Sequence, residues 1–179
     1  METVQLSLLQ EGKKAPDFSV PASNPDFVLL RTKSANANFG FNGKTISLAD
    51  YKNKKIVILY FYPKDNTPGC TLQACNFRDK IVQFDKTDAV ILGVSPDSVA
   101  SHHKFIEKFK LPFILLADID HKLCESYGVW VEKNMYGRKY MGVARTTYVI
   151  DKEGKILKAF AKVNPLKHIN EVLAFLQSL

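Results

Sequence analysis

The sequence has no apolar run that approaches the roughly 20 residues a membrane-spanning helix needs. Its first residues, METVQLSLLQEGKK, lack a basic stretch followed by an apolar one, so they do not resemble a secretory signal. These two absences make the cytoplasm the default compartment, with a nuclear or organellar location left open.

Motifs for nucleotides and metals are also missing. Neither GxGxxG nor GxxxxGK[ST] occurs in the chain. None of the four histidines, His102, His103, His121 and His168, stands at zinc-finger spacing from a cysteine. His102 and His103 are adjacent, so on a helix they point to different sides and do not readily share one ion. The sequence therefore predicts no cofactor and no metal site.

Positive charge is plentiful but scattered. The net charge is +7, yet the lysines and arginines occur in short groups along the whole chain. Nucleic-acid binders usually gather their basic residues on one face. A solvated basic surface is therefore favoured, and no specific nucleic-acid partner is expected.

Cysteines are few, at Cys70, Cys75 and Cys124. An odd number without a secretory signal fits a reducing compartment, where thiols are catalytic or incidental rather than structural staples. Cys124 lies in HKLCESY, a short helical pattern, and we expect it to be structural.

Apolar, β-rich runs alternate with amphipathic stretches over most of the chain, as in an α/β fold. A mixed sheet is expected, with parallel crossovers first and an antiparallel hairpin last, in one domain over residues 1–179. The predicted strands are 56–62, at the centre, 89–95, 113–117, 144–151 and 155–160. The predicted helices are 68–85, 97–110, 122–127 and 165–179.

Residues 21–43 are rich in Pro, Ser, Asn and Gly, and we expect an extended irregular segment there. Within it, Asn42 and Gly43 predict a hairpin turn between residues 39–41 and 44–46, because both tolerate positive φ. A surface loop is favoured over a partner contact for this segment.

Cys70 follows the central strand at the predicted start of a helix, in YFYPKDNTPGCTLQAC. A helix N-terminus presents unpaired N–H groups and a partial positive charge, which favour a thiolate. Thr67 is a candidate cap whose hydroxyl could bond the thiolate or an incoming oxygen. The plainer alternative, that Cys70 is a small buried hydrophobe, is less favoured in this strand–turn–helix context.

Cys75 lies five residues further along the same predicted helix. Five helical steps separate the Cα atoms by about 8.6 Å, whereas a disulfide tolerates roughly 4.4–6.8 Å. If the two cysteines pair, the first turns of the helix must therefore unwind. The alternative is that Cys75 only packs against the core.

Residues 61–79, FYPKDNTPGCTLQACNFRD, resemble the active-site segment of peroxiredoxins, in particular the bacterioferritin comigratory protein (PrxQ) subfamily. Residues 127–137 and 145–151 resemble the same subfamily, and the similarity extends from about residue 9 to the C-terminus. The resemblance implies a thioredoxin-like fold with a mixed sheet flanked by helices. It also implies a monomeric peroxidase that reduces hydrogen peroxide and organic hydroperoxides and is recycled by thioredoxin or a similar dithiol.

The same resemblance implies roles for five residues. Cys70 would be the peroxidatic cysteine and Cys75 the resolving one. Thr67 would hydrogen-bond the peroxide, Pro63 would shield the pocket, and Arg145 would reach in from a distant strand. Spacing alone would make Arg145 an ordinary surface arginine.

Two departures from the subfamily are Gln73, where many members have Glu, and the long segment 21–43. Two other functions stay open on the sequence. A general thiol–disulfide oxidoreductase would reduce protein disulfides without consuming peroxide quickly, although PxxxTPGC in place of CxxC speaks against it. A redox sensor or basic interaction module would be oxidised without turnover or would bind nucleic acid in a salt-dependent way.

Overall fold

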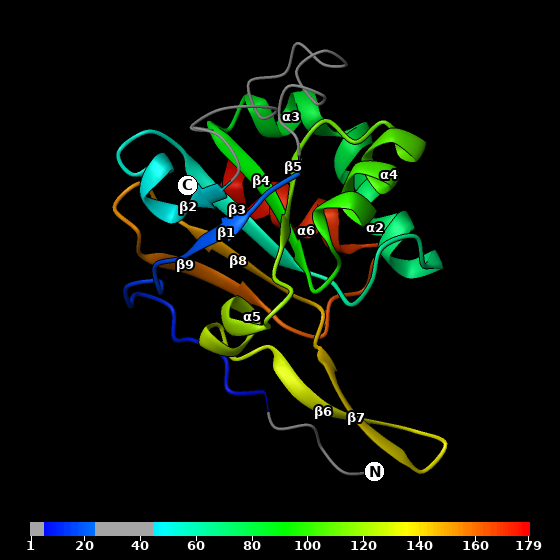
Figure 1. The fold of residues 1–179 in the computed structure, drawn as a ribbon. Helices are drawn as coiled ribbons and strands as arrows, with labels where there is room; N and C mark the ends of the chain where they lie inside the picture. The colour runs from blue at the N-terminus through cyan, green and yellow to red at the C-terminus, as the bar shows by residue number, and fades with distance from the viewer. Residues whose placement is uncertain (1–5, 24–44) are drawn as a thin grey trace.

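The computed structural model of the chain describes residues 6–23 and 45–179. Figure 1 shows a central sheet with helices packed against it and a long hairpin that extends from the body. The elements in chain order are β1 (Ser19–Pro21), β2 (Thr45–Ser47), the 3₁₀ helix η1 (Leu48–Tyr51), β3 (Ile56–Phe61), α2 (Pro68–Asp79), α3 (Ile81–Asp85), β4 (Ala89–Ser95), α4 (Val99–Phe109), β5 (Ile114–Ala117), α5 (Lys122–Ser126), β6 (Trp130–Met135), β7 (Arg138–Val143), β8 (Thr146–Ile150), β9 (Ile156–Phe160) and α6 (His168–Gln177).

The central sheet has five strands in the order β5-β4-β3-β8-β9. Strand β3 pairs in parallel with β4 and antiparallel with β8, and β8 continues antiparallel to β9. Every residue of β3 after Ile56 is buried, as a strand in the middle of a covered sheet requires. The predicted mixed sheet, with its parallel part first and its antiparallel pair last, is confirmed.

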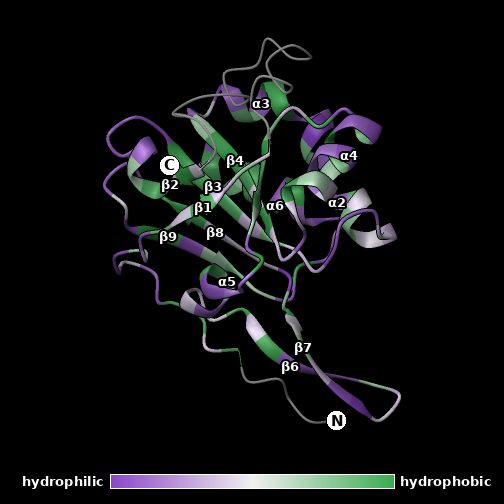
Figure 2. Ribbon diagram, viewed as in Figure 1, coloured by the Kyte–Doolittle hydropathy of each residue, from purple (hydrophilic) through white to green (hydrophobic). Residues whose placement is uncertain are grey.

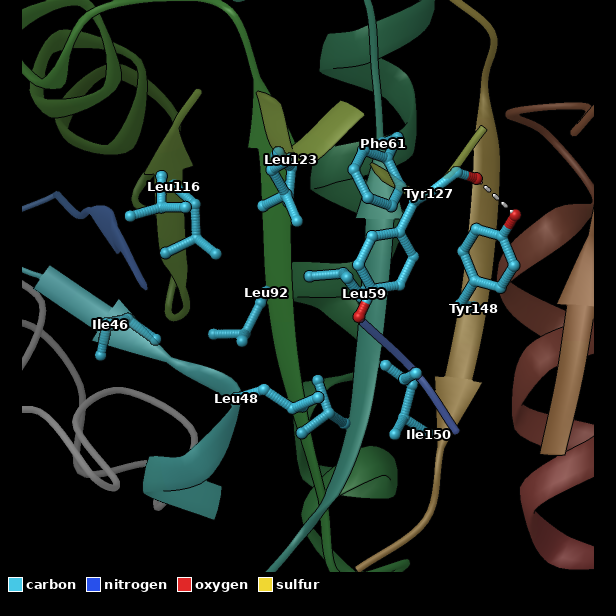
Figure 3. Packing of buried hydrophobic residues seen from close by; sticks show 14 of the residues in the cluster. Ile46, Leu48, Leu59, Phe61, Leu92, Leu116, Leu123, Tyr127, Tyr148 and Ile150 are labelled. Atoms are coloured by element: carbon cyan, nitrogen blue, oxygen red, sulfur yellow. Dashed lines mark hydrogen bonds between the residues drawn. The ribbon is translucent and has the colours of Figure 1, made fainter. Parts of the chain in front are cut away.

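The two faces of the sheet pack against separate hydrophobic cores. Leu59 and Phe61 point into one core, with Tyr127 beside them and the hydroxyl of Tyr148 donating to the Tyr127 carbonyl at 2.8 Å (Figure 3). Ile58 and Tyr60 face the other core, which α2, α3, α4 and α6 cover. Hydrophobic residues follow β3 and β4 along their length (Figure 2). Cys70 belongs to the helix-covered core, so the site lies on that side of the sheet.

The predicted helix over residues 68–85 is wrong in one respect, because it is two helices. Lys80 leaves the helical region, with φ −110° and ψ 13°, and separates α2 from α3. Phe77 and Phe84 are nevertheless both buried in the same core, with ring centroids 5.5 Å apart. Apolar residues on both sides of the break face the same core, so their helical periodicity continues across it. The sequence therefore does not reveal the break.

The β6–β7 hairpin was not predicted. Its two-residue turn, Tyr136–Gly137, has positive φ at both positions, 52° and 79°, a turn geometry that suits the twist of a hairpin. Beyond Val131 most of its residues are exposed, so neither face carries the alternation of a half-buried strand. A hairpin that extends beyond the core leaves no hydrophobic pattern in the sequence.

The segment predicted to be irregular from residue 21 begins with paired residues, beside β5 at the edge of the central sheet. Strand β1 pairs with β2, and Ala22 forms a bridge with Leu116. The Asn42–Gly43 turn lies outside the described residues. The assignment of residues 1–179 to one domain stays a prediction for the same reason.

Candidate active site

Cys70 occupies the first turn of α2, three residues after Thr67, which holds the cap position. Its side chain is buried, with 2% of the residue exposed. The first intrahelical bond runs from the Thr71 N–H to the Thr67 carbonyl at 2.9 Å, so the N–H groups of Gly69 and Cys70 have no acceptor within the helix. The predicted placement of this thiol at a helix N-terminus is confirmed.

Arg145 lies between β7 and β8 and reaches the sulfur from the other half of the chain. Its Nη2 donates to Cys70 Sγ at 3.3 Å, and its Nη1 donates to Gln73 Oε1 at 2.6 Å. A Cβ atom on Gly69 would lie 3.3 Å from Nη2, so the absence of a side chain there leaves room for the guanidinium. A fixed positive charge therefore contacts the sulfur at the helix N-terminus.

Gln73 contributes to the site in a way that the sequence did not predict. It is fully buried one turn after Cys70, and its amide oxygen holds the guanidinium of Arg145. Among the residues that the structure describes, its Nε2 has no hydrogen-bond partner. Its position three residues after Cys70 could have indicated a place in the site, because residues three apart lie on the same face of a helix.

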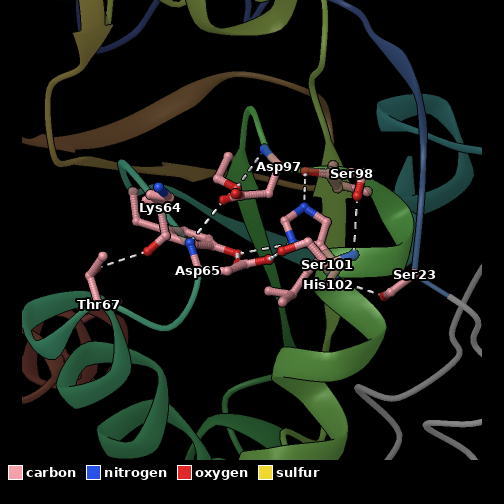
Figure 4. Close-up of polar contacts among 12 residues, drawn as sticks. Ser23, Lys64, Asp65, Thr67, Asp97, Ser98, Ser101 and His102 are labelled. Carbon is pink, nitrogen blue, oxygen red and sulfur yellow. Dashed lines mark hydrogen bonds and ion pairs between the residues drawn. The ribbon is translucent and has the colours of Figure 1, made fainter.

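Thr67 is placed as predicted but bonds differently. Its hydroxyl makes no capping bond and instead donates to the Lys64 carbonyl at 2.9 Å (Figure 4). With its proton engaged, the oxygen retains lone pairs that can accept from a peroxide O–H. Pro63 lies half-buried in the same loop between β3 and α2.

The other two cysteines lie in different surroundings. Cys75 is half-buried on α2, where burial raises the pKa of its thiol. Cys124 is fully buried in the core on the opposite face of the sheet from Cys70. Burial raises the pKa of the Cys124 thiol strongly, and a hydrogen bond with Asp118 adds to the effect. The geometry therefore places Cys75, not Cys124, on the same helix as the candidate nucleophile.

Two further basic groups experience the charge of Arg145. Burial lowers the pKa of Lys133 on β6, Arg145 lowers it further, and Cys70 opposes the shift. The aliphatic part of Lys133 lies over Gly142, where a Cβ would come within 3.2 Å of its Cδ. Burial, aided by Arg145, lowers the pKa of His168 to about 4, so this imidazole is neutral near pH 7.

In the ranges 6–23 and 45–179, none of the helices combines the length and the apolar character needed to cross a bilayer.

The AhpC/TSA family model matches residues 12–159 of the chain. Peroxiredoxin Bcp of Bacillus subtilis is 46% identical over 171 residues, which cover 96% of this chain and 97% of that protein. The putative peroxiredoxin bcp of Coxiella burnetii is 46% identical over 165 residues, covering 92% and 97%.

Solved structures give a concordant result. A cysteine-to-serine mutant of Xylella fastidiosa PrxQ superposes with a TM-score of 0.80 at 31% identity, covering 96% of this chain and 98% of that one. The Xanthomonas campestris bacterioferritin comigratory protein, solved for insight into its alkyl peroxide reduction activity, gives 0.72 at 40% identity, covering 76% and 86%. The predicted thioredoxin-like fold is confirmed.

Proposed function

This chain belongs to the AhpC/TSA family as a peroxiredoxin of the bacterioferritin comigratory protein subfamily, and we propose how its cysteines reduce peroxides. Cys70 reacts with hydrogen peroxide or an organic hydroperoxide, and Cys75 resolves the product as an intramolecular disulfide. Thioredoxin or a similar dithiol then reduces that disulfide, and the protein acts as a monomer.

The observation that carries the proposal is the contact of the Arg145 guanidinium with Cys70 Sγ at 3.3 Å, at the N-terminal turn of α2. Both the positive charge and the helix N-terminus stabilise negative charge on sulfur. They also face the region where charge develops on the leaving oxygen as the peroxide bond breaks. The Thr67 oxygen and Pro63 lie in the loop that would border the bound peroxide.

The catalytic cycle has three steps. The Cys70 thiolate attacks one peroxide oxygen, the O–O bond breaks, and the other oxygen takes up a proton and leaves as water or an alcohol. Cys70 is then a sulfenic acid, the reversible first stage of thiol oxidation. The Cys75 thiol condenses with it, forming the S–S bond and releasing water. A dithiol donor finally transfers two electrons and two protons by exchange, returning both thiols and becoming a disulfide itself.

The condensation requires a change in α2, which includes both cysteines in one continuous helix. Their Cα atoms are about 8.6 Å apart on an ideal helix, beyond the roughly 6.8 Å limit for a disulfide. Unwinding the first turns would also remove the burial that raises the pKa of Cys75. Local unfolding thus both shortens the distance and favours the reactive thiolate of the resolving residue.

Steady-state turnover with a dithiol donor tests the proposal in three variants. Cys70→Ser should abolish turnover, whereas Cys75→Ser should undergo one oxidation and then recycle poorly. Cys124→Ala serves as the matched control, since that thiol is buried on the other face of the sheet, and its turnover should equal the wild type. Unchanged turnover in Cys70→Ser would overturn the mechanism.

A further inference from the structure

A buried polar cluster lies behind the loop that carries Thr67 into the active site (Figure 4). We call it the Asp65 cluster, and it joins the loop to the end of β4, to α4 and to β5. Its members are Tyr62, Asp65, Ser95, Asp97, Ser101 and His102.

The Asp65 carboxylate is the centre of the cluster and is 6% exposed. Its Oδ1 accepts from the Tyr62 hydroxyl at 2.6 Å, and its Oδ2 accepts from the Ser101 hydroxyl at 2.8 Å. The same Oδ2 lies 2.7 Å from His102 Nδ1. Ser101 and His102 both belong to α4, so this carboxylate attaches the active-site loop to a helix that carries no thiol.

The backbone of this loop, between β3 and α2, is also held at Asp65. The Asp65 N–H donates to Asp97 Oδ2 at 2.8 Å, and the Ser95 hydroxyl donates to that oxygen at 2.7 Å. Ser95 ends β4, a strand buried along its whole length. Asp65 is therefore fixed through both its side chain and its main chain to rigid elements.

His102 extends the anchor to a third element. This residue is fully buried, and its Nε2 lies 3.0 Å from the Leu116 carbonyl oxygen on β5. A carbonyl only accepts, so Nε2 carries a hydrogen. On the other side, Nδ1 faces the Asp65 carboxylate, and that contact needs one shared proton. Every hydrogen bond of the pair is then satisfied, as a buried polar network must be to stabilise one arrangement.

We propose that Asp65 is a positioning residue for peroxide reduction: through its buried cluster it holds the Pro63–Thr67 loop, and with it the start of α2, in the peroxide-reactive geometry. The inference deepens the proposed function and rests on it. None of the cluster residues lies on α2, so the loop stays attached while the first turns of α2 unwind. An anchor outside the moving segment lets the reduced site re-form with Thr67 and Cys70 in the same relative place.

A positioning role for Asp65 predicts slower oxidation of Cys70 by peroxide but an unchanged rate of disulfide reduction. The oxidation of Cys70 by peroxide needs the folded loop, whereas the disulfide form has already lost the first turns of α2. Misplacement of a reacting group by about 1 Å can cost on the order of 100-fold in rate. In Asp65→Ala we therefore expect the second-order rate constant for Cys70 oxidation to fall about 10- to 100-fold. Reduction of the disulfide by dithiothreitol should change less than about twofold, because that step does not use the loop.

The experiment measures both rate constants by rapid quench and mass spectrometry, with folding checked by circular dichroism. Asp65→Asn keeps an acceptor for Tyr62 and offers an N–H towards His102 Nδ1 but loses the acceptor for Ser101, so it should restore part of the oxidation rate. Asp118→Ala is the matched control, because Asp118 is also buried and accepts two N–H bonds, but at the start of α5. That variant should leave both rate constants unchanged.

Equal oxidation rates in Asp65→Ala and wild type, or equal slowing of both half-reactions, would overturn the positioning role. Should Asp65→Ala fail to fold, Asp97→Ala replaces it: this half-buried carboxylate accepts from the Asp65 N–H and the Ser95 hydroxyl, and its loss should also slow oxidation selectively. Absence of Cys70 oxidation in the wild type would overturn the proposed function and the positioning role together.

Discussion

Arg145 performs two tasks at the scale of single residues. One nitrogen of its guanidinium contacts the Cys70 sulfur while another is held by the Gln73 amide oxygen. Gln73 thereby fixes the direction of the positive charge without adding a charge of its own. A planar fork with several donors is needed for this arrangement, and lysine does not supply one.

The first prediction concerns that fork. Arg145→Lys keeps the charge but loses the planar fork that reaches Cys70 and Gln73 together, so kcat/KM for hydrogen peroxide should fall about 100-fold. Arg138→Lys is the matched control, since Arg138 is exposed on β7, and its kcat/KM should stay at the wild-type value. Initial rates over a range of peroxide concentrations measure both, and an unchanged value in Arg145→Lys would contradict the role.

The second prediction concerns His168, whose pKa burial lowers from 6.5 to about 4 in the folded chain. Between those values the unfolded state binds more protons than the folded state, so stability falls as pH falls from 6.5 towards 4. The loss amounts to on the order of 3 kcal/mol at most.

Chemical denaturation at several pH values tests this. His168→Gln can still bond Thr147, as the imidazole Nε2 does at 2.7 Å, but it has no proton to gain. The difference in unfolding free energy between pH 7 and pH 4.5 should therefore be smaller in the variant. Parallel pH curves for the two proteins would refute the assignment.

At the scale of elements, α2 is the segment that the proposed mechanism requires to unwind. It carries the proposed nucleophile, Cys70, in its first turn and the proposed resolving residue, Cys75, about one and a half turns later. We expect hydrogen exchange to show loss of protection in residues 68–75 on oxidation, because a Cys70–Cys75 bond does not fit an intact helix.

Helix α4 provides the internal control for this measurement. It belongs to the same core and contains no cysteine, so its amides should keep their protection in both redox states. Equal protection of α2 in the reduced and oxidised proteins would count against unwinding.

The elements differ in how well the sequence predicts them. Central strands such as β3 and β4 are buried on both faces, so their apolar runs are unbroken and were predicted within a residue or two. The break at Lys80 conserves the apolar spacing, and the β6–β7 hairpin has little buried face, so neither leaves a periodic signal. The periodicity of apolar residues in a sequence reflects which residues are buried. Neither the break at Lys80 nor the β6–β7 hairpin changes that periodicity.

On the scale of the whole molecule, the sequence predicts the parts of the site that lie close together along the chain better than those brought together by folding. Pro63, Thr67, Cys70 and Cys75 lie within thirteen residues, so a single motif predicts them together. Arg145 is 75 residues from Cys70 and was predicted only through family resemblance. The Asp65 cluster joins three separate parts of the chain, and such a combination becomes visible only in the folded structure.

The sheet itself separates the thiols. Cys70 lies in the core under the helices and Cys124 in the core on the opposite face, so a bond between them would have to cross the buried strands. Cys75 shares α2 with Cys70 and needs only a local rearrangement. The arrangement of the whole fold thus favours Cys75 over Cys124 as the proposed resolving thiol.

The most direct test adds one equivalent of hydrogen peroxide to the reduced protein and maps the disulfides by peptide mass spectrometry. The proposed mechanism predicts a Cys70–Cys75 bond within seconds and an unmodified Cys124. A Cys70–Cys124 bond, or no rapid oxidation at Cys70, would contradict it.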